Sequence, residues 1–171
     1  MRNQEALLII LRGNSGSGKT SSAKTLQKRL GHGTMLISQD VVRREILYVK
    51  DGPDSATSQL LFELCLYGKL HCEITILEGI LDSTWYHKLF ERLQKEFGNN
   101  LLAYYFDIPF EETLCRHQHK PNAHEFGEKE MRSWWVEKDY LRMIPEKTIQ
   151  EHLSPEDILS MISQDIQIKF S

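Results

Sequence analysis

The sequence predicts an α/β fold in which helices cover both faces of a parallel β-sheet. Two observations support this prediction. Apolar runs of strand length alternate with longer segments that have helical spacing, and a glycine-rich phosphate-binding pattern stands between the first run and the first helix. Such alternation is typical of a three-layer α/β/α sandwich, because crossover helices return the chain to the same edge of a parallel sheet.

Length and composition narrow the class of protein. The chain has 171 residues, so we expect one domain, residues 1–171. It is 40% hydrophobic and 26% charged, with a formal net charge of −3, and this slight acidic excess provides no general affinity for nucleic acid or anionic membranes. No stretch approaches the length of a membrane span, and residues 6–11 are too short for a signal-peptide core. We therefore expect a cytoplasmic protein.

The chain is organised around residues 13–20, which read Gly-Asn-Ser-Gly-Ser-Gly-Lys-Thr and match the pattern G-x-x-x-x-G-K-[ST] in full. An unbroken apolar run, residues 6–11, precedes the pattern as a predicted strand. Residues 21–30, rich in helix-forming residues and followed by Gly31, come after it as a predicted helix. This context favours a genuine phosphate-binding loop over a chance match in a glycine-rich turn.

The residue types of this loop suit a nucleoside triphosphate. Glycines let the backbone curl around a phosphate, and the N–H groups of the loop and of the helix start point at the anion. Lys19 is expected to reach the β- and γ-phosphates, and the Thr20 hydroxyl to hold Mg²⁺. We therefore predict a site for ATP or GTP. Its residues are Gly13, Asn14, Ser15, Gly16, Ser17, Gly18, Lys19, Thr20 and Ser21.

A carboxylate follows the second predicted strand. Residues 34–38 read as this strand, and Asp40 stands just before a predicted helix over residues 41–47. Because ligands of open α/β sheets lie at the carboxyl ends of the strands, Asp40 is expected one strand away from the phosphate loop, where it can accept a proton from an attacking hydroxyl. Arg43 would project near it, one helical turn on. The alternative is that Asp40 only caps the helix.

The phosphate-binding loop together with the run Ser-Gln-Asp-Val-Val-Arg at residues 38–43 resembles the P-loop kinases grouped around polynucleotide 5′-hydroxyl kinase, chloramphenicol phosphotransferase and zeta toxin. The resemblance implies the fold of P-loop nucleoside triphosphate hydrolases, with an AAA-type ATP-binding kinase domain, five strands in the order 2-3-1-4-5 and a small helical lid over about residues 116–130. It also implies ATP and Mg²⁺ as cofactors. Asp40 would be the base toward a substrate hydroxyl, and Arg43 would contact the phosphate side of the site.

Glu78 lies near the end of a third predicted strand, residues 74–79. A Walker B strand would end in an aspartate that holds Mg²⁺ through water, so Glu78 is expected either to take this role or to bind the substrate. The alternative is a residue of the turn alone. A helix is then expected to start at Asp82 or Ser83 and to run to Phe97, with one apolar face.

A fourth predicted strand, residues 101–106, leads into a helix that carries Arg116, with Lys120 just after it. Here a strand is followed by the pattern D-x-P-x-E and then by a helix with an arginine. This order of features resembles the start of the lid in the same kinase superfamily. By that resemblance Arg116 would stabilise charge on the transferring phosphoryl group, and would be catalytic together with Lys19 and Asp40. Lys120 stands where many such lids have a second arginine, and we expect it to bind substrate. For both residues the alternative is a solvated basic face.

The last third of the chain completes the predicted order of elements. A second lid helix is expected over residues 125–140, with Trp134 and Trp135 packing the lid onto the domain. The alternative for the two tryptophans is stacking on a base or substrate ring. A short fifth strand is expected at residues 147–149, and Ser154 begins a final helix. By the resemblance, the loop around Pro145 would lie against the adenine.

These expectations together predict an ATP- and Mg²⁺-dependent kinase that phosphorylates a hydroxyl of a small molecule such as a nucleoside, a sugar or an antibiotic. One alternative is a polynucleotide 5′-hydroxyl kinase, which the balanced charge disfavours. Another is a nucleotide-binding switch, or a toxin-type protein controlled by a partner. The sequence has neither an N-K-x-D nor a D-x-x-G motif, so the GTPase form of the switch is disfavoured.

Overall fold

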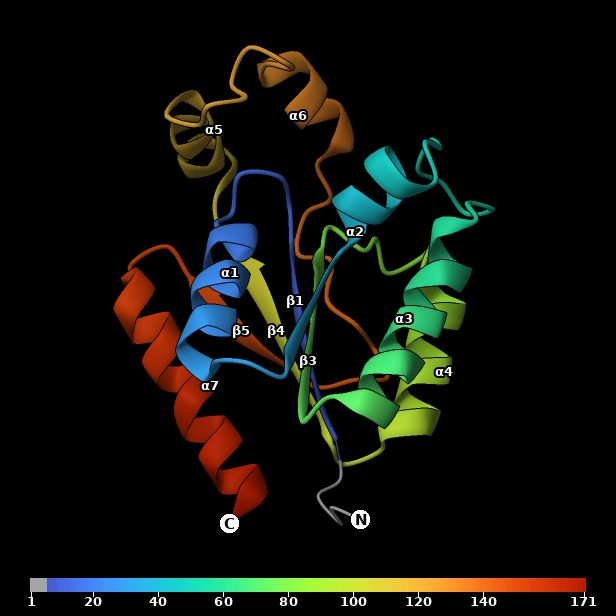
Figure 1. The fold of residues 1–171 in the computed structure, drawn as a ribbon. Coiled ribbons are helices and arrows are strands. Elements are labelled where there is room, and N and C mark those ends of the chain that lie inside the picture. Colours follow the sequence, from blue (N-terminus) through green and yellow to red (C-terminus); the bar gives the residue numbers. More distant parts are fainter. Residues whose placement is uncertain (1–5) are drawn as a thin grey trace.

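The computed structural model describes residues 6–171, and the strands in this part of the chain form one parallel sheet (Figure 1). The strand order is β2-β3-β1-β4-β5, which confirms the order that the resemblance implied. The strands are β1 (Leu7–Gly13), β2 (Thr34–Ser38), β3 (Ile74–Gly79), β4 (Leu101–Asp107) and β5 (Glu146–Gln150). The register aligns Gly13 with Phe106 and Ser38 with Glu78, so the carboxyl ends of the strands share one edge.

Helices cover both faces of this sheet, as predicted. On one face lie α1 (Lys19–Leu30) and α7 (Pro155–Phe170), and on the other lie α3 (Thr57–His71) and α4 (His87–Phe97), as Figure 1 shows. The central strand β1 is buried along its whole length. Its side chains alternate between a core shared with α1 and α7 and a core shared with α3 and α4, which explains why its apolar run is continuous.

Smaller helices stand at the carboxyl edge of the sheet. α2 (Gln39–Val41) continues into a wider π-helical turn, η1 (Val42–Ile46), while α5 (Phe110–Gln118) and α6 (Glu128–Trp134) lie above the edge in Figure 1. We call residues 119–134 the lid segment and residues 135–145, which lead from α6 to β5, the return segment. The predicted lid, residues 116–130, falls on the last turn of α5 and on the lid segment.

Two predicted helices have different bounds in the structure. The helix expected over residues 125–140 ends at Trp134, because the Trp135 ring packs edge-on against Phe110 and the backbone of Val136 is hydrogen-bonded by the side chain of Asn14. Residues 82–86 form a turn in which Asp82 Oδ1 accepts two backbone N–H groups, so α4 begins only at His87. In both places, contacts outside the helix determined where it starts or ends.

Arg12 is a charged residue inside the apolar strand β1, and its side chain is fully buried. Its guanidinium donates to both carboxylate oxygens of Glu146, the nearer at 3.0 Å, to the Asp139 carboxylate at 2.8 Å and to the Leu81 carbonyl at 2.9 Å. Burial raises the pKa of Glu146, and the charge of Arg12 opposes that shift. This network ties β5, the return segment and the loop after β3 to the central strand.

Hydropathy along the helices shows a further property of the fold. Within residues 6–171, no helix combines the length and the apolar character that a membrane span requires.

Candidate active site

The loop of residues 13–20 connects β1 to α1 at the carboxyl edge of the sheet. Gly16 has φ +81°, and a Cβ there would lie 2.6 Å from the Thr113 carbonyl oxygen, so only glycine lets the loop pass α5. Gly18, with φ +95°, then turns the chain into α1. The first turn of α1 has no acidic residue, so its free N–H groups and the positive end of its dipole are available to an anion.

Lys19 is the first residue of α1, and only 7% of it is exposed. Its Nζ donates to the carbonyl of Asn14 at 3.1 Å, so the ammonium group lies inside the curl of the loop. Burial lowers the pKa of Lys19, and the negative charge of Glu78 opposes that shift. A phosphate in the loop would offer the ammonium a negatively charged partner in place of a neutral carbonyl.

Glu78 is 2% exposed and lies between two hydroxyl groups. One of its carboxylate oxygens accepts from Thr20 Oγ1 at 2.9 Å, and the other accepts from Ser38 Oγ at 2.5 Å. A hydroxyl and a carboxylate side by side, next to a phosphate-binding loop, form an oxygen donor set that suits Mg²⁺, which keeps few protein ligands and completes its shell with water and phosphate oxygens. The residues present therefore fit the ion that the resemblance implies.

Asp40 lies in the first turn of α2, just beyond the carboxyl end of β2. Its carboxylate is 62% exposed and forms ion pairs with Arg43 at 2.9 Å and Arg44 at 3.3 Å. The N-cap residue of α2 is Ser38, without a capping side-chain hydrogen bond, so the carboxylate of Asp40 is paired with arginines rather than engaged as that cap. An exposed carboxylate at this edge can be reached by a hydroxyl.

Arg43 lies in the π-helical turn η1, with 18% of its side chain exposed. Its Nη2 contacts Asp40, whereas its Nε is buried and has no hydrogen-bond partner within residues 6–171. π-Helical turns frequently occur at functional sites, and a buried donor without a partner is costly. Next to Asp40, the guanidinium group of Arg43 therefore has one N–H donor, at Nε, that is not used by the described residues.

Sequence reasoning missed a buried network that supports this side of the site. Gln39 Nε2 donates to the Tyr86 hydroxyl and to Asp51, each at 2.9 Å, and the Tyr86 hydroxyl donates to Asp51 at 2.6 Å. Burial, followed by the hydrogen bond to Asp51, raises the pKa of Tyr86. The three residues come from α2, the loop before α3 and the turn before α4, so no local pattern in the sequence links them.

Arg116 and Lys120 occupy different parts of the site. Arg116 Nη1 donates to the Ser17 carbonyl at 3.1 Å, and its Nε is held by Glu112 at 2.7 Å. Together with residues of the phosphate-binding loop and α1, it lines a cavity of about 350 Å³ that is also lined by Leu153 and Pro155. Arg116 thus lies above the phosphate-binding loop, beside a cavity that opens next to it.

Lys120 belongs to the lid segment, and its charge interacts with those of the two carboxylates Glu78 and Asp40. Burial lowers the pKa of Lys120, whereas the negative charges of Glu78 and Asp40 act in the opposite direction. The charge of Lys120 in turn contributes to the lowered pKa of Lys19. The charges of Lys19, Lys120, Glu78 and Asp40 therefore act on one another at this edge of the sheet.

The expectation for Pro145 is wrong. Pro145 precedes β5, and the next residue, Glu146, aligns with Ala103, whereas Gly13 of the phosphate-binding loop aligns with Phe106 farther along β4. Because the strands are parallel, the loop before β5 lies toward the opposite edge of the sheet. The cavity beside the phosphate-binding loop is instead lined by Leu153 and Pro155, which follow β5.

The two tryptophans of the lid region pack against its own aromatic residues. Trp134 lies edge-on to Phe126 with ring centroids 5.0 Å apart, and Trp135 lies edge-on to Phe110 at 5.2 Å. Phe126 also stacks on the ring of His117, which is buried. Trp135 thus packs on α5, in agreement with the expected packing role, whereas Trp134 packs on Phe126 within the lid segment itself rather than onto the domain.

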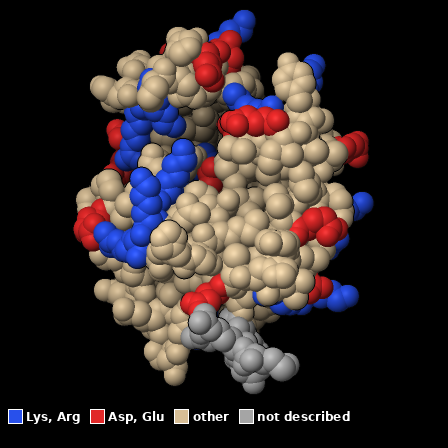
Figure 2. Space-filling model, in the orientation of Figure 1, with Lys and Arg blue, Asp and Glu red and all other residues tan. Residues whose placement is uncertain are grey.

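The surface of the molecule is hollowed beneath the lid segment. Figure 2 shows Lys and Arg side chains gathered over α1 and α5 on one side of this hollow, and acidic and basic side chains together over α2 on the other. The ion pairs of Asp40 with Arg43 and Arg44 account for the mixed charge over α2 and η1. Arg44 also lies 3.9 Å from Glu125 of the lid segment, so the two sides approach each other across the hollow.

Comparison with known proteins places this geometry in a family. No protein with a curated description matches the sequence. Solved structures with similar folds include the APS kinase of Mycobacterium tuberculosis in complex with AMPPNP and APS, with 18% identity, a TM-score of 0.69, and coverage of 95% of this chain and 98% of that one. A gluconokinase from Sinorhizobium meliloti 1021 has 13% identity and a TM-score of 0.66, and 98% of this chain and 99% of that one are covered.

At such low identity these similarities establish the fold of P-loop kinases and nothing finer. A family model described as an AAA domain matches residues 8–134, which is more than half of the chain. These residues include the phosphate-binding loop, Asp40, Glu78, Arg116 and Lys120. The chain therefore belongs to this AAA-domain family.

Proposed function

We propose that the protein is an ATP- and Mg²⁺-dependent kinase that transfers the γ-phosphoryl group to a hydroxyl of a small molecule. The observation that carries the proposal is that the phosphate-binding loop, with its buried Lys19, is joined through Thr20 to Glu78, while the exposed carboxylate of Asp40 lies at the same edge of the sheet. The fold shared with the AMPPNP-bound APS kinase supports ATP as the donor. A phosphate-binding protein without transfer activity would need no carboxylate on the far side of the phosphates.

The nucleotide would lie between the loop and the cavity beside it. The loop N–H groups and Lys19 would bind the phosphates, with the ammonium leaving the Asn14 carbonyl for a phosphate oxygen. The base would enter the cavity between Arg116 and the wall formed by Leu153 and Pro155. In this arrangement Arg116 acts mainly on the nucleotide, and Lys120 takes the position next to the transferring group.

Thr20 and Glu78 are the residues that would hold Mg²⁺. The ion supplies neutralisation of the charge on the β- and γ-phosphates. Ser38 donates to the other oxygen of Glu78 and so fixes the orientation of this carboxylate. This assignment places Glu78 on the metal side of the site rather than on the acceptor side.

Asp40 would orient the acceptor and take its proton. The acceptor oxygen forms a bond to the γ-phosphorus as the bond from that phosphorus to the bridging oxygen of ADP breaks, and the hydroxyl proton passes to the Asp40 carboxylate. Arg43 and Arg44 hold the carboxylate from one side, which leaves its exposed side for the hydroxyl. Lys120 would stabilise the phosphoryl charge, and the lid segment would exclude water, the competing acceptor.

The test is ADP release by the wild-type protein and by Asp40→Asn, with pools of nucleosides, sugars, aminoglycosides and oligonucleotides with 5′-hydroxyl ends. Asp54→Asn, an exposed aspartate in the loop before α3, is the matched control. We expect one small-molecule pool to accelerate ADP release in the wild type and the control, and Asp40→Asn to lose this gain while it still binds ATP.

If only the oligonucleotides accelerate ADP release, the acceptor is a nucleic acid and not a small molecule. Slow turnover that no pool changes, and that is equal in wild type and Asp40→Asn, would contradict the kinase proposal. The nucleotide-switch function would then account better for the site.

A further inference from the structure

His117 lies in the last turn of α5, and only 2% of it is exposed. Its Nε2 is 2.8 Å from the carbonyl oxygen of Phe126 in the lid segment. Because a carbonyl can only accept, this nitrogen carries the ring hydrogen and donates it. The other ring nitrogen, Nδ1, is buried and has no hydrogen-bond partner within residues 6–171. Among the described residues, the imidazole therefore bonds to the lid segment alone.

The rings of the same two residues also stack. Their centroids are 4.3 Å apart and their planes differ by 20°, and Trp134 packs edge-on to Phe126 with ring centroids 5.0 Å apart. Phe126 is thus held by His117 both through its main chain and through its ring. Together these contacts close the loop of residues 118–125 onto the end of α5.

Lys120 lies inside this closed loop. Its N–H donates to the carbonyl of His117 at 2.9 Å, and its own carbonyl accepts from the N–H of Ala123 at 3.1 Å. Burial lowers the pKa of Lys120, whereas the negative charges of Glu78 and Asp40 oppose that shift. An ammonium group in such a place has lost part of its hydration, so it stays there only if the main chain of the loop holds it.

Helix α5 is itself fixed against the phosphate-binding loop. Arg116, the residue before His117, donates from Nη1 to the Ser17 carbonyl at 3.1 Å. A Cβ on Gly16 would lie only 2.6 Å from the Thr113 carbonyl oxygen, so the loop and α5 pass each other in close contact. The position of His117 is therefore defined relative to the loop that would hold the phosphates.

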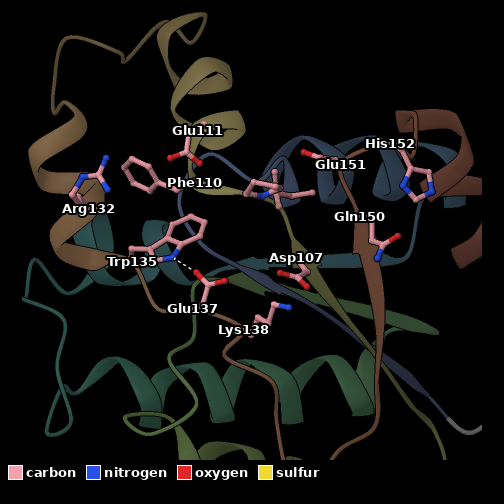
Figure 3. A pocket seen from close by; sticks show the side chains of 12 residues that line it. Asp107, Phe110, Glu111, Arg132, Trp135, Glu137, Lys138, Gln150, Glu151 and His152 are labelled. Carbon is pink, nitrogen blue, oxygen red and sulfur yellow. Dashed lines mark hydrogen bonds between the residues drawn. The ribbon is translucent and has the colours of Figure 1, made fainter.

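A second contact holds the far end of the lid segment on α5. Figure 3 shows Arg132 and Trp135 beside the ring of Phe110, in the wall of a cavity of about 710 Å³. The Arg132 guanidinium lies 4.2 Å from the centroid of this ring, and the Trp135 ring is edge-on to it with centroids 5.2 Å apart. This contact fixes the position of α6. The loop that precedes α6 is held by the imidazole instead.

We propose that His117 is a positioning residue that, through the hydrogen bond from its Nε2 to Phe126, holds the loop that carries Lys120. The proposal rests on the kinase function proposed above, in which Lys120 stabilises the charge of the transferring phosphoryl group. Without this bond the Phe126 carbonyl, which belongs to a half-buried residue, turns to water. The loop then opens, and the ammonium group of Lys120 regains its hydration away from Glu78 and Asp40.

Two substitutions separate the hydrogen bond from the ring. His117→Phe keeps a ring that can stack but has no N–H, whereas His117→Gln keeps an N–H donor at a similar reach but has no ring. His119→Phe is the matched control, because it makes the same change at an exposed histidine whose ring bonds to the carbonyl of Cys115 in α5. The measurements are kcat and the KM for ATP in the transfer reaction, and amide hydrogen exchange of residues 119–127 in the nucleotide-free protein.

We expect His117→Phe to lower kcat by roughly tenfold with a smaller change in the KM for ATP, because a displaced Lys120 affects the transferring group rather than nucleotide binding. The amides of residues 119–127 should exchange faster in this variant. His117→Gln should restore most of both properties, and His119→Phe should change neither. In a Lys120→Met background, His117→Phe should have no further effect on kcat, a non-additivity that general destabilisation of the fold would not produce.

An unchanged kcat in His117→Phe would overturn the proposal, and so would additive effects of His117→Phe and Lys120→Met, or a His117→Gln variant as slow as His117→Phe. A further test needs no variant to fold. In ¹⁵N NMR spectra of the wild-type imidazoles, His117 should carry its hydrogen on Nε2, and a hydrogen on Nδ1 alone would contradict the bond to Phe126.

The exchange and NMR measurements require no turnover. A protein whose loop of residues 118–125 is held by His117 in both measurements, but which phosphorylates nothing, would contradict the kinase proposal and leave the contact between His117 and the lid segment intact.

Discussion

The hydroxyl of Thr20 donates a hydrogen bond to the carboxylate of Glu78 over 2.9 Å, and this contact joins the phosphate-binding loop to the neighbouring strand β3. The two residues are 58 positions apart in the sequence. Because Glu78 is buried and accepts hydrogen bonds from Thr20 and Ser38, its carboxylate is held in place beside the phosphate-binding loop. The two oxygens provide the physical basis for assigning Mg²⁺ to this point.

Glu78→Gln should therefore impair use of Mg²⁺ more than binding of nucleotide. The amide keeps the size and one oxygen acceptor but removes the charge, so we expect kcat to fall by roughly a hundredfold or more, as for loss of a preorganised charged group in other enzymes. The Mg²⁺ concentration for half-maximal activity should rise. The measurement is a titration of activity with Mg²⁺, and Glu91→Gln on the exposed face of α4 is the control. If the Mg²⁺ concentration for half-maximal activity is the same in Glu78→Gln and in the wild type, Glu78 is not a ligand of the metal.

Arg116→Met and Lys120→Met should have different kinetic effects. Arg116 lies above the loop and beside the cavity, so its loss should raise the KM for ATP with a smaller change in kcat. The charge of Lys120 interacts with those of Glu78 and Asp40, so its loss should lower kcat by roughly tenfold to a hundredfold at saturating ATP. Steady-state kinetics of both variants under the same conditions is the measurement. If loss of Arg116 lowers kcat and loss of Lys120 raises the KM for ATP, Arg116 is the residue that stabilises the transferring phosphoryl group, as the resemblance implied.

Tyr86→Phe should affect the acceptor rather than ATP. The hydroxyl that is lost binds Asp51 and Gln39, which together hold the loop before α3 to the end of β2. We expect a stability loss of about 1 kcal/mol and a raised KM for the acceptor. Tyr104→Phe is a matched control, because it also removes a buried hydroxyl bonded to an aspartate, Asp165, but on the α7 face. Equal acceptor KM values in the two variants would contradict the role of the network.

Arg12→Met should destabilise the protein strongly. It leaves the carboxylates of Glu146 and Asp139 buried without their cation, which costs about 3–5 kcal/mol when one partner of a buried pair is removed. At this chain length the loss corresponds to a decrease in Tm of roughly 10 °C. Thermal unfolding followed by circular dichroism is the measurement. Arg29→Met, which breaks the exposed pair with Glu156, should leave the Tm nearly unchanged, and a similar decrease there would contradict the argument.

Lys19 should make the nucleotide-free protein less stable at neutral pH than at alkaline pH. Burial lowers its pKa below 10.5, so the unfolded chain binds this proton more tightly than the folded one. The free energy of unfolding therefore rises as pH increases from the lowered pKa to 10.5, and below that interval the penalty is fully present. Lys19→Met should remove this rise and abolish transfer. The rise in the free energy of unfolding is measured by urea unfolding between pH 7 and 10. The control is Lys24→Met, which changes an exposed lysine of α1.

Much of the architecture was predictable because it depends on local signals. The apolar run before the glycines predicted β1, the loop pattern predicted the turn into α1, and the resemblance at residues 38–43 implied the strand order, which the structure confirms. The edge rule for parallel sheets correctly placed Glu78 beside the loop. Asp40, expected one strand away from the loop, instead follows β2, which lies two strands from β1 because β3 is between them. Helix ends were less predictable, because the side chain of Asn14 and the ring of Phe110 ended α6 at Trp134.

The sequence by itself determined that this chain forms a parallel α/β sheet with a phosphate-binding loop, because glycine spacing and apolar periodicity act over a few residues. Only the tertiary structure decided what each charged side chain contacts. It joined Thr20 to Glu78, Asn14 to Val136, Arg12 to Glu146 and Arg116 to the Ser17 carbonyl of the loop. The physical reason is that these pairs lie between 58 and 134 positions apart, and folding alone sets their distances and burial.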